Sequence, residues 1–196
     1  MDRAGVTVVL PEGAPERTAA EAVARLDGWI RERLAERAAH QATVAARGRS
    51  LPWLGSTLEL VPQPGRKNAR LDGGRVLVPE GDHRPALERL IRREARREIT
   101  GRLDRVTAAC GTDWSSLRIG DMKTRWASCS AGGRMSFSWR LMLAPSEVLE
   151  TVVWHEACHI DEPSHSPRFW ELMDRRRPGH RTDSAWLAKH GATLAI

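Results

Sequence analysis

The 196-residue sequence has only three cysteines, no tyrosine and no long apolar run. Cys110, Cys129 and Cys158 are an odd number without a CxxC pair, so the sequence predicts neither a disulfide framework nor a cysteine zinc site. The lack of about 18 consecutive apolar residues argues against a membrane-spanning helix, and the first residues lack the pattern of a secretory signal. We therefore expect a soluble, cytoplasmic protein with no membrane partner.

Lysine is also rare, and the formal net charge of +6 comes almost entirely from arginine. An excess of positive charge attracts polyanions, so a nucleic acid is a candidate partner. Arginine and glutamate nevertheless alternate along residues 88–98, and mixed signs are typical of a solvated helix face. A solvated basic surface is the favoured interpretation, and the sequence gives no prediction of oligomeric state.

Residues 1–80 are predicted to form an amino-terminal lobe of a strand, a helix and a small sheet. Residues 6–10 have the composition of a strand, and apolar residues recur at helical spacing between residues 16 and 47. Two further strands are expected at residues 58–61 and 75–78. The Pro and Gly turn signals between them favour a hairpin-linked sheet.

Residues 81–196 are predicted to form the core, in one compact unit with the lobe. Residues 84–110 carry an apolar stripe at helical spacing, from Leu87 through Ile99 to Val106. A strand is expected at residues 117–119. Residues 126–139 look like a hairpin, because apolar and polar residues alternate in its second arm.

The sequence HEACH, residues 155–159, lies on a predicted helix that begins near Pro145. A helix advances about 100° per residue, so His155 and His159 lie one turn apart on the same face and can bind one ion. Glu156 projects beside that ion. An HExxH match is expected by chance only about 0.02 times in a chain of this composition, so the motif predicts a metal site.

A catalytic zinc ion takes three protein ligands and leaves a fourth position for water. Glu162-Pro163 ends the helix, and His165 follows just before Ser166-Pro167, which has the pattern of a helix cap. We therefore predict His165 as the third ligand of a Zn²⁺ ion. Three alternatives remain open for this ligand: Glu171, Asp161 and His180.

The predicted set of residues indicates hydrolysis of an amide bond in a peptide or protein. Zinc lowers the pKa of a bound water, and Glu156 is the expected general base. An extended substrate can pair with an exposed strand edge, and the predicted hairpin is the candidate edge. The candidate substrate-binding residues lie at its two ends: Arg125, Trp126, Ser138 and Trp139.

Four segments in the same order resemble the YgjP-like metallopeptidases, relatives of the SprT and Wss1-like zinc peptidases. They are KTRWASCS (residues 123–130), MSFSWRLMLAP (135–145), VVWHEACHIDEPSHSPRFWELM (152–173) and RPGHRTDSAWLAKHG (177–191). The resemblance implies zinc on His155, His159 and His165 and catalysis by Glu156. It also implies a zincin-like α+β fold, in which the HExxH helix packs with a second long helix against a small, mostly antiparallel sheet.

The chain departs from the family pattern at three positions. Ala127 replaces a glycine, Ser138 replaces an asparagine, and Cys158 stands where the family has a small or aliphatic residue. The first two bear on substrate contacts, and Cys158 is expected to be a packing residue. Two functions compete with the peptidase: a nucleic-acid-associated zinc module that acts on DNA-bound proteins, and a structural zinc domain with Glu162 or Glu171 as a fourth ligand.

Overall fold

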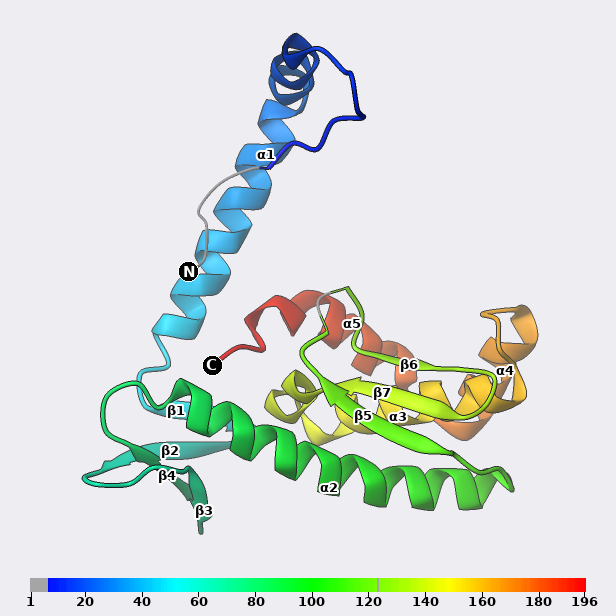
Figure 1. The fold of residues 1–196 in the computed structure, drawn as a ribbon. Coiled ribbons are helices and arrows are strands. Elements are labelled where there is room, and N and C mark those ends of the chain that lie inside the picture. The colour runs from blue at the N-terminus through cyan, green and yellow to red at the C-terminus, as the bar shows by residue number, and fades with distance from the viewer. Residues whose placement is uncertain (1–6, 123) are drawn as a thin grey trace. The chain divides into compact units, whose positions relative to one another are not determined.

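The computed structural model describes residues 7–122 and 124–196, which fall into two compact units (Figure 1). The first unit, residues 1–46, contains one long helix, α1 (Glu16–Ala45). The second unit, residues 47–196, holds all other elements. Residues 7–10 form no strand, which corrects the strand predicted at 6–10, and Val6 lies outside the described residues.

The second unit contains two small sheets, one on each side of α2 in chain order. The first sheet has the order β1-β2-β4-β3, and the second has the order β5-β7-β6. The strands are β1 (Ser50–Trp53), β2 (Ser56–Gln63), β3 (Arg70–Asp72), β4 (Arg75–Pro79), β5 (Ser116–Gly120), β6 (Ala127–Cys129) and β7 (Arg134–Ser138). The helices are α2 (Arg84–Cys110), α3 (Ser146–Asp161), α4 (Pro167–Arg176) and α5 (His180–His190), with the 3-10 helices η1 (Trp139–Leu143) and η2 (Gly191–Thr193).

The pairing in the first sheet differs from the predicted hairpin. β2 and β4 pair in parallel, while β1 pairs with β2 and β3 pairs with β4 in antiparallel orientation. The turn between β1 and β2 places Leu54 and Gly55 at positive φ, as a tight two-residue hairpin turn requires. The Leu54 N–H donates to the carbonyl of Met142 in η1, so this turn is tied to the second half of the unit.

One continuous core joins both sheets through α2. The predicted apolar stripe of this helix, from Leu87 through Ile99 to Val106, is buried. Val76 of β4 and Phe137 of β7 belong to the same buried cluster as these residues. The α+β class and the long second helix are therefore confirmed. The structure does not divide at the predicted boundary near residue 80, because the first sheet shares its core with α2.

The second arm of the predicted hairpin is shorter than the sequence pattern indicated. β7 ends at Ser138, whose hydroxyl accepts a hydrogen bond from the Arg140 N–H and begins η1. The apolar residues Trp139 and Leu141 continue the alternating pattern but are buried in this 3-10 helix. Every second residue from Met135 to Leu141 is buried, although only the first two belong to a strand. The alternating pattern therefore did not reveal where the strand ends and the 3-10 helix begins.

Two arginines fasten the residues that follow α5. Arg47 donates to the carbonyls of Thr193 and Ala195, at 2.8 and 3.1 Å. Arg140 donates to the carbonyl of Leu194, at 2.9 Å, and forms an ion pair with Asp121. Residues 193–195 are therefore held by side chains from distant parts of the second unit.

The arginines of α2 form the ion pairs expected of a solvated face, such as Arg92 with Glu88, but Arg102 is an exception. Its side chain is only 12% exposed and contacts Glu98 in α2 and Glu150 in α3. It also donates to the carbonyl and the hydroxyl of Ser146, where α3 begins. Arg102 therefore fixes the amino end of α3 against α2.

Replacing Arg102 by alanine should lower the free energy of unfolding by about 2 kcal/mol, because Glu98 and the carbonyl and hydroxyl of Ser146 would lose the hydrogen bonds of this largely buried guanidinium. Glu150 would keep its bonds to Arg105 and Trp154. Chemical denaturation measures this change. Arg89→Ala, on the exposed side of the same helix, is the control and should change the free energy by no more than about 0.5 kcal/mol. Equal effects of the two substitutions would contradict this role of Arg102.

Candidate metal centre

Helix α3 presents His155 and His159 one turn apart, as the sequence predicts. Its other face, including Val153 and Ala157, is buried in the core, and the helix packs against α2, α4 and α5. Glu156 lies between the histidines and is 5% exposed. The core packing of α3 therefore fixes the direction of all three functional side chains.

The chain turns back at the end of α3 and brings a third histidine to the first two. Glu162 ends the helix in an extended conformation before Pro163. The Ser166 hydroxyl accepts from the Phe169 N–H and caps α4, as predicted. His165 lies in this short connection, with its Nε2 2.9 Å from Nε2 of His155.

The geometry of the three histidines fits a metal ion. Their ligand atoms all lie within 4.8 Å of one another. Two nitrogens bound to one tetrahedral zinc ion are roughly 3.3 Å apart, which is close to the observed spacing of His155 and His165. His159 directs Nδ1 to the Glu162 carbonyl at 3.0 Å, so its Nε2 is the atom that faces the cluster.

The alternative ligands do not join this cluster. Within the described residues, the group that could hold a metal consists of the three histidines alone. Asp161 forms an ion pair with Arg176 at 2.6 Å, and His180 bonds to Asp174 at 2.9 Å. Glu162 and Glu171 are likewise outside the group.

Burial favours the neutral imidazoles that a metal requires. Desolvation, followed by repulsion from His159 and His165, lowers the pKa of His155 to about 4. Desolvation is also the main cause that lowers the pKa of His159. Both rings are therefore neutral at physiological pH, and each retains a nitrogen lone pair for a metal.

Glu156 is a buried acid with one unsatisfied oxygen. Burial raises the pKa of Glu156 to about 8, against smaller opposing effects of Arg125 and of a hydrogen bond from the Cys129 N–H. Its Oε2 is buried and has no hydrogen-bond partner among the described residues. A carboxyl group in this state accepts a proton readily, which suits a general base.

An aromatic platform on α4 supports the three imidazoles. Phe169 is fully buried, and its ring centroid lies 4.9, 4.5 and 4.9 Å from those of His155, His159 and His165. Trp170 stacks on His165 at 5.7 Å. Cys158 packs with Phe169 beneath this platform, as the sequence analysis expected of a packing residue.

A cleft of about 590 Å³ opens in front of the histidines. It is lined by residues of the connection before β6, of β6 itself, of α3, of the α3–α4 connection and of α5: Arg125, Trp126, Ala127, Ser128, Cys129, Thr151, Val152, His155, Glu156, His159, Pro163, His165, Ser184, Leu187 and Ala188. The cleft is therefore lined both by the three histidines and by the predicted edge strand.

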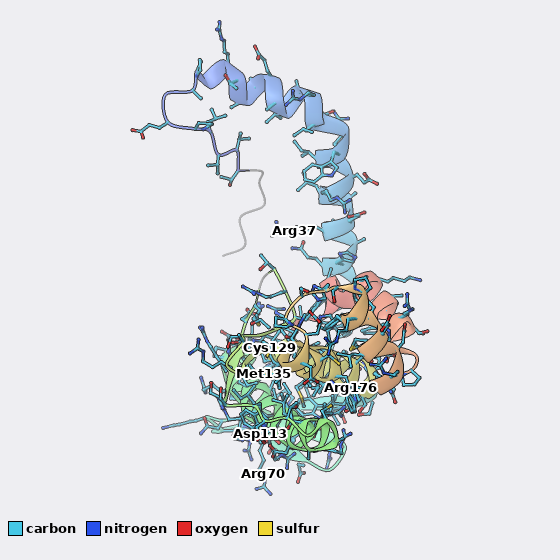
Figure 2. All side chains as sticks on the ribbon, turned by 90° about the vertical axis from the view of Figure 1, so that its right-hand side faces the viewer. Arg37, Arg70, Asp113, Cys129, Met135 and Arg176 are labelled. Atoms are coloured by element: carbon cyan, nitrogen blue, oxygen red, sulfur yellow. The ribbon has the colours of Figure 1, made fainter. Side chains whose placement is uncertain are left out.

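Strand β6 is an edge of the second sheet, and Cys129 lies opposite Met135 of β7. Both residues are labelled in Figure 2. The Trp126 carbonyl accepts from the Ser138 N–H, and the Ser130 N–H donates to the carbonyl of Arg134. In an antiparallel pair these bonds alternate, so the backbone groups of Ala127 and Cys129 point away from β7. The hydrogen bond from Cys129 to Glu156 agrees with this direction.

The four candidate substrate-binding residues separate into two pairs. Arg125 and Trp126 line the cleft. Ser138 and Trp139 do not, because they are 0% and 1% exposed and lie in the core. A side chain without accessible surface cannot contact a substrate, so Ser138 and Trp139 are corrected to core residues. Ala127 is also buried, so the methyl group that replaces the family glycine points into the protein.

The sequence analysis missed the contributions of Phe169 and α5 to the site. Phe169 lies in the segment of residues 152–173 that resembles the family, but no sequence pattern assigned it a role in the site. Leu187 and Ala188 lie in the segment similar to the family, but no spacing connects them to the HExxH motif. Their positions depend on how α5 packs against α3, which has no local signal in the sequence.

Comparison with known proteins identifies the class to which this fold and site belong. The family model for the YgjP-like metallopeptidase domain matches residues 1–190. The chain belongs to the YgjP-like metallopeptidase family, and the predicted resemblance is confirmed. No curated protein matches the chain. No helix among the described residues is long and apolar enough to span a membrane.

Two solved structures are similar to part of the chain. The metallopeptidase zymogen abylysin of Pyrococcus abyssi has 19% sequence identity and a TM-score of 0.42, over 46% of this chain and 93% of that chain. The metallopeptidase zymogen jannalysin of Methanocaldococcus jannaschii has 18% identity and a TM-score of 0.40, over 47% of this chain and 87% of that chain.

Replacing Phe169 by leucine should weaken zinc binding about tenfold, because the imidazoles lose their common support before any ligand is removed. Competition with a chromophoric chelator measures this affinity. Met173→Leu is the matched control, since Met173 is equally buried one turn further along α4. Equal zinc affinities in these two variants would contradict the positioning role of Phe169.

The metal-free protein should become less stable relative to Glu156→Gln as the pH rises from about 5 to about 8.5. The folded state keeps the Glu156 proton up to about pH 8, whereas the unfolded state releases it near 4.5, so folding loses stability between these values. Urea unfolding in chelator measures the difference between the two proteins. All other ionisable groups are common to the two proteins, so their contributions largely cancel. A difference independent of pH would contradict the raised pKa.

Proposed function

We propose that the protein is a zinc-dependent peptidase with His155, His159 and His165 as metal ligands and Glu156 as general base. One observation carries this proposal. The three imidazole ligand atoms lie within 4.8 Å of one another, beside a buried carboxyl group whose Oε2 has no partner among the described residues. Three ligands and an adjacent base are the minimum set for metal-assisted hydrolysis.

The residues divide the chemistry between them. Zinc, when bound, supplies a Lewis acid that lowers the pKa of a water molecule and polarises the scissile carbonyl. Glu156 takes a proton from the water through its free oxygen and later delivers it to the leaving amine. The hydrogen bond from Cys129 holds the carboxylate in place during both transfers. Arg125 lowers the pKa of Glu156 and so partly offsets the effect of burial.

The edge of β6 that faces the cleft is the proposed binding surface for an extended peptide. Its backbone groups face the cleft at Ala127, whereas the outward N–H of Cys129 is already used by Glu156. A substrate can therefore pair with β6 mainly through the N–H and C=O of Ala127. Such pairing places the peptide backbone alongside Glu156 and the histidines, which is the orientation that hydrolysis requires.

A structural zinc site is the less supported alternative. Such a site needs four protein ligands, and the cluster within the described residues contains three. An open position at a cleft of about 590 Å³ is expected of a catalytic site. The arrangement of the three histidines therefore supports a catalytic zinc site over a purely structural one.

Replacing Glu156 by glutamine should abolish peptide cleavage, by at least about 100-fold, while zinc remains bound at one ion per chain. Cleavage of casein and metal analysis of the same preparations measure the two quantities. His165→Ala is the companion variant and should lose stoichiometric zinc together with activity. Equal cleavage by the wild type and the Glu156→Gln variant would overturn the proposed mechanism.

A further inference from the structure

The cleft extends beyond the three histidines to a more apolar end, where residues of α5 form part of the lining. Val152 lies one turn before Glu156 on α3 and belongs to the cleft lining. Leu187 and Ala188 of α5 face it from the other side, and Trp126 forms a third wall. We name these four residues, Trp126, Val152, Leu187 and Ala188, the α5 subsite.

The walls of the α5 subsite are fixed by close packing. The indole of Trp126 lies directly against Gly191, where a Cβ atom would approach Cζ2 of the ring to 2.6 Å. Leu187, in the last turn of α5, is buried. Thr151, beside Val152, donates its hydroxyl to Asp183 and accepts from Arg177, so its hydrogen-bonding capacity is used outside the cleft.

Charge is scarce around the α5 subsite. Among the described residues that line the cleft, only Arg125 and Glu156 belong to the Asp, Glu, Lys and Arg types. Glu156 serves the reaction in the proposed function, and Arg125 is an exposed side chain. A charged substrate side chain placed among Trp126, Val152 and Leu187 would lose its hydration without gaining a partner. An apolar side chain gains free energy from the same burial.

We propose that the α5 subsite binds an uncharged apolar side chain of the substrate, of the class of leucine, methionine or phenylalanine. This inference rests on the proposed peptidase function and adds the substrate class. Val152 and Glu156 are separated by about 6 Å along the helix, so the bound side chain belongs to a residue that flanks the scissile bond. The small side chain of Ala188 leaves the space that the substrate residue fills.

Replacing Ala188 by leucine tests the assignment, because it adds three carbons inside the subsite. The wild type and the variant are incubated with a peptide library derived from a digested proteome, and the cleavage sites are identified by mass spectrometry. The wild type should cleave mainly beside leucine, methionine or phenylalanine. In the variant, cleavage beside these residues should fall at least about tenfold relative to cleavage beside alanine or glycine.

Ala185→Leu is the matched control, since Ala185 is exposed on α5 and lies outside the cleft lining. It should retain the preference of the wild type. Failure of the two proposals is distinguishable. A zinc-loaded wild type that cleaves no library peptide overturns the peptidase. A wild type that cleaves without apolar preference, or one whose preference survives Ala188→Leu, overturns the α5 subsite alone.

Discussion

The convergence of three imidazoles on one point is the constraint on which the rest of the structure depends. Two of them follow from helical geometry, because His155 and His159 share a face of α3. The third requires the chain to reverse within a few residues, and the Glu162-Pro163 break with the Ser166 cap makes that reversal possible. Phe169 then contacts all three rings, so a single buried side chain supports the whole cluster.

Burial affects the protonation states of both His155 and Glu156. The same low-polarity surroundings lower the pKa of His155 and raise the pKa of Glu156, so the metal-free site favours neutral forms of both. A divalent cation among the imidazoles reverses the preference of the carboxyl group, because a nearby positive charge stabilises its ionised form. In the proposed mechanism, metal binding and ionisation of Glu156 are therefore one coupled event, accompanied by release of a proton.

The features that the sequence predicts well have local signals. The stripe of α2, the HExxH spacing and the Ser166 cap are each contained in a few neighbouring residues, and the structure forms all three. The features that it predicts poorly depend on distant pairing. The parallel pairing of β2 with β4 could not be read from either strand alone. The burial of Ser138 also depends on the surrounding elements that enclose η1.

Arg47 and Arg140 hold residues 193–195 in place through hydrogen bonds to the carbonyls of these residues. Gly191, which supports the Trp126 indole, lies between α5 and this fastened segment. The segment therefore acts as an anchor for one wall of the cleft, while the three histidines are supported separately by α4 and by the packing of α3 against α2. If the cleft binds peptides as proposed, substitutions at these two arginines would change which peptides are accepted and leave the histidine cluster intact. Selectivity and catalysis would then be able to evolve as separate properties in this fold.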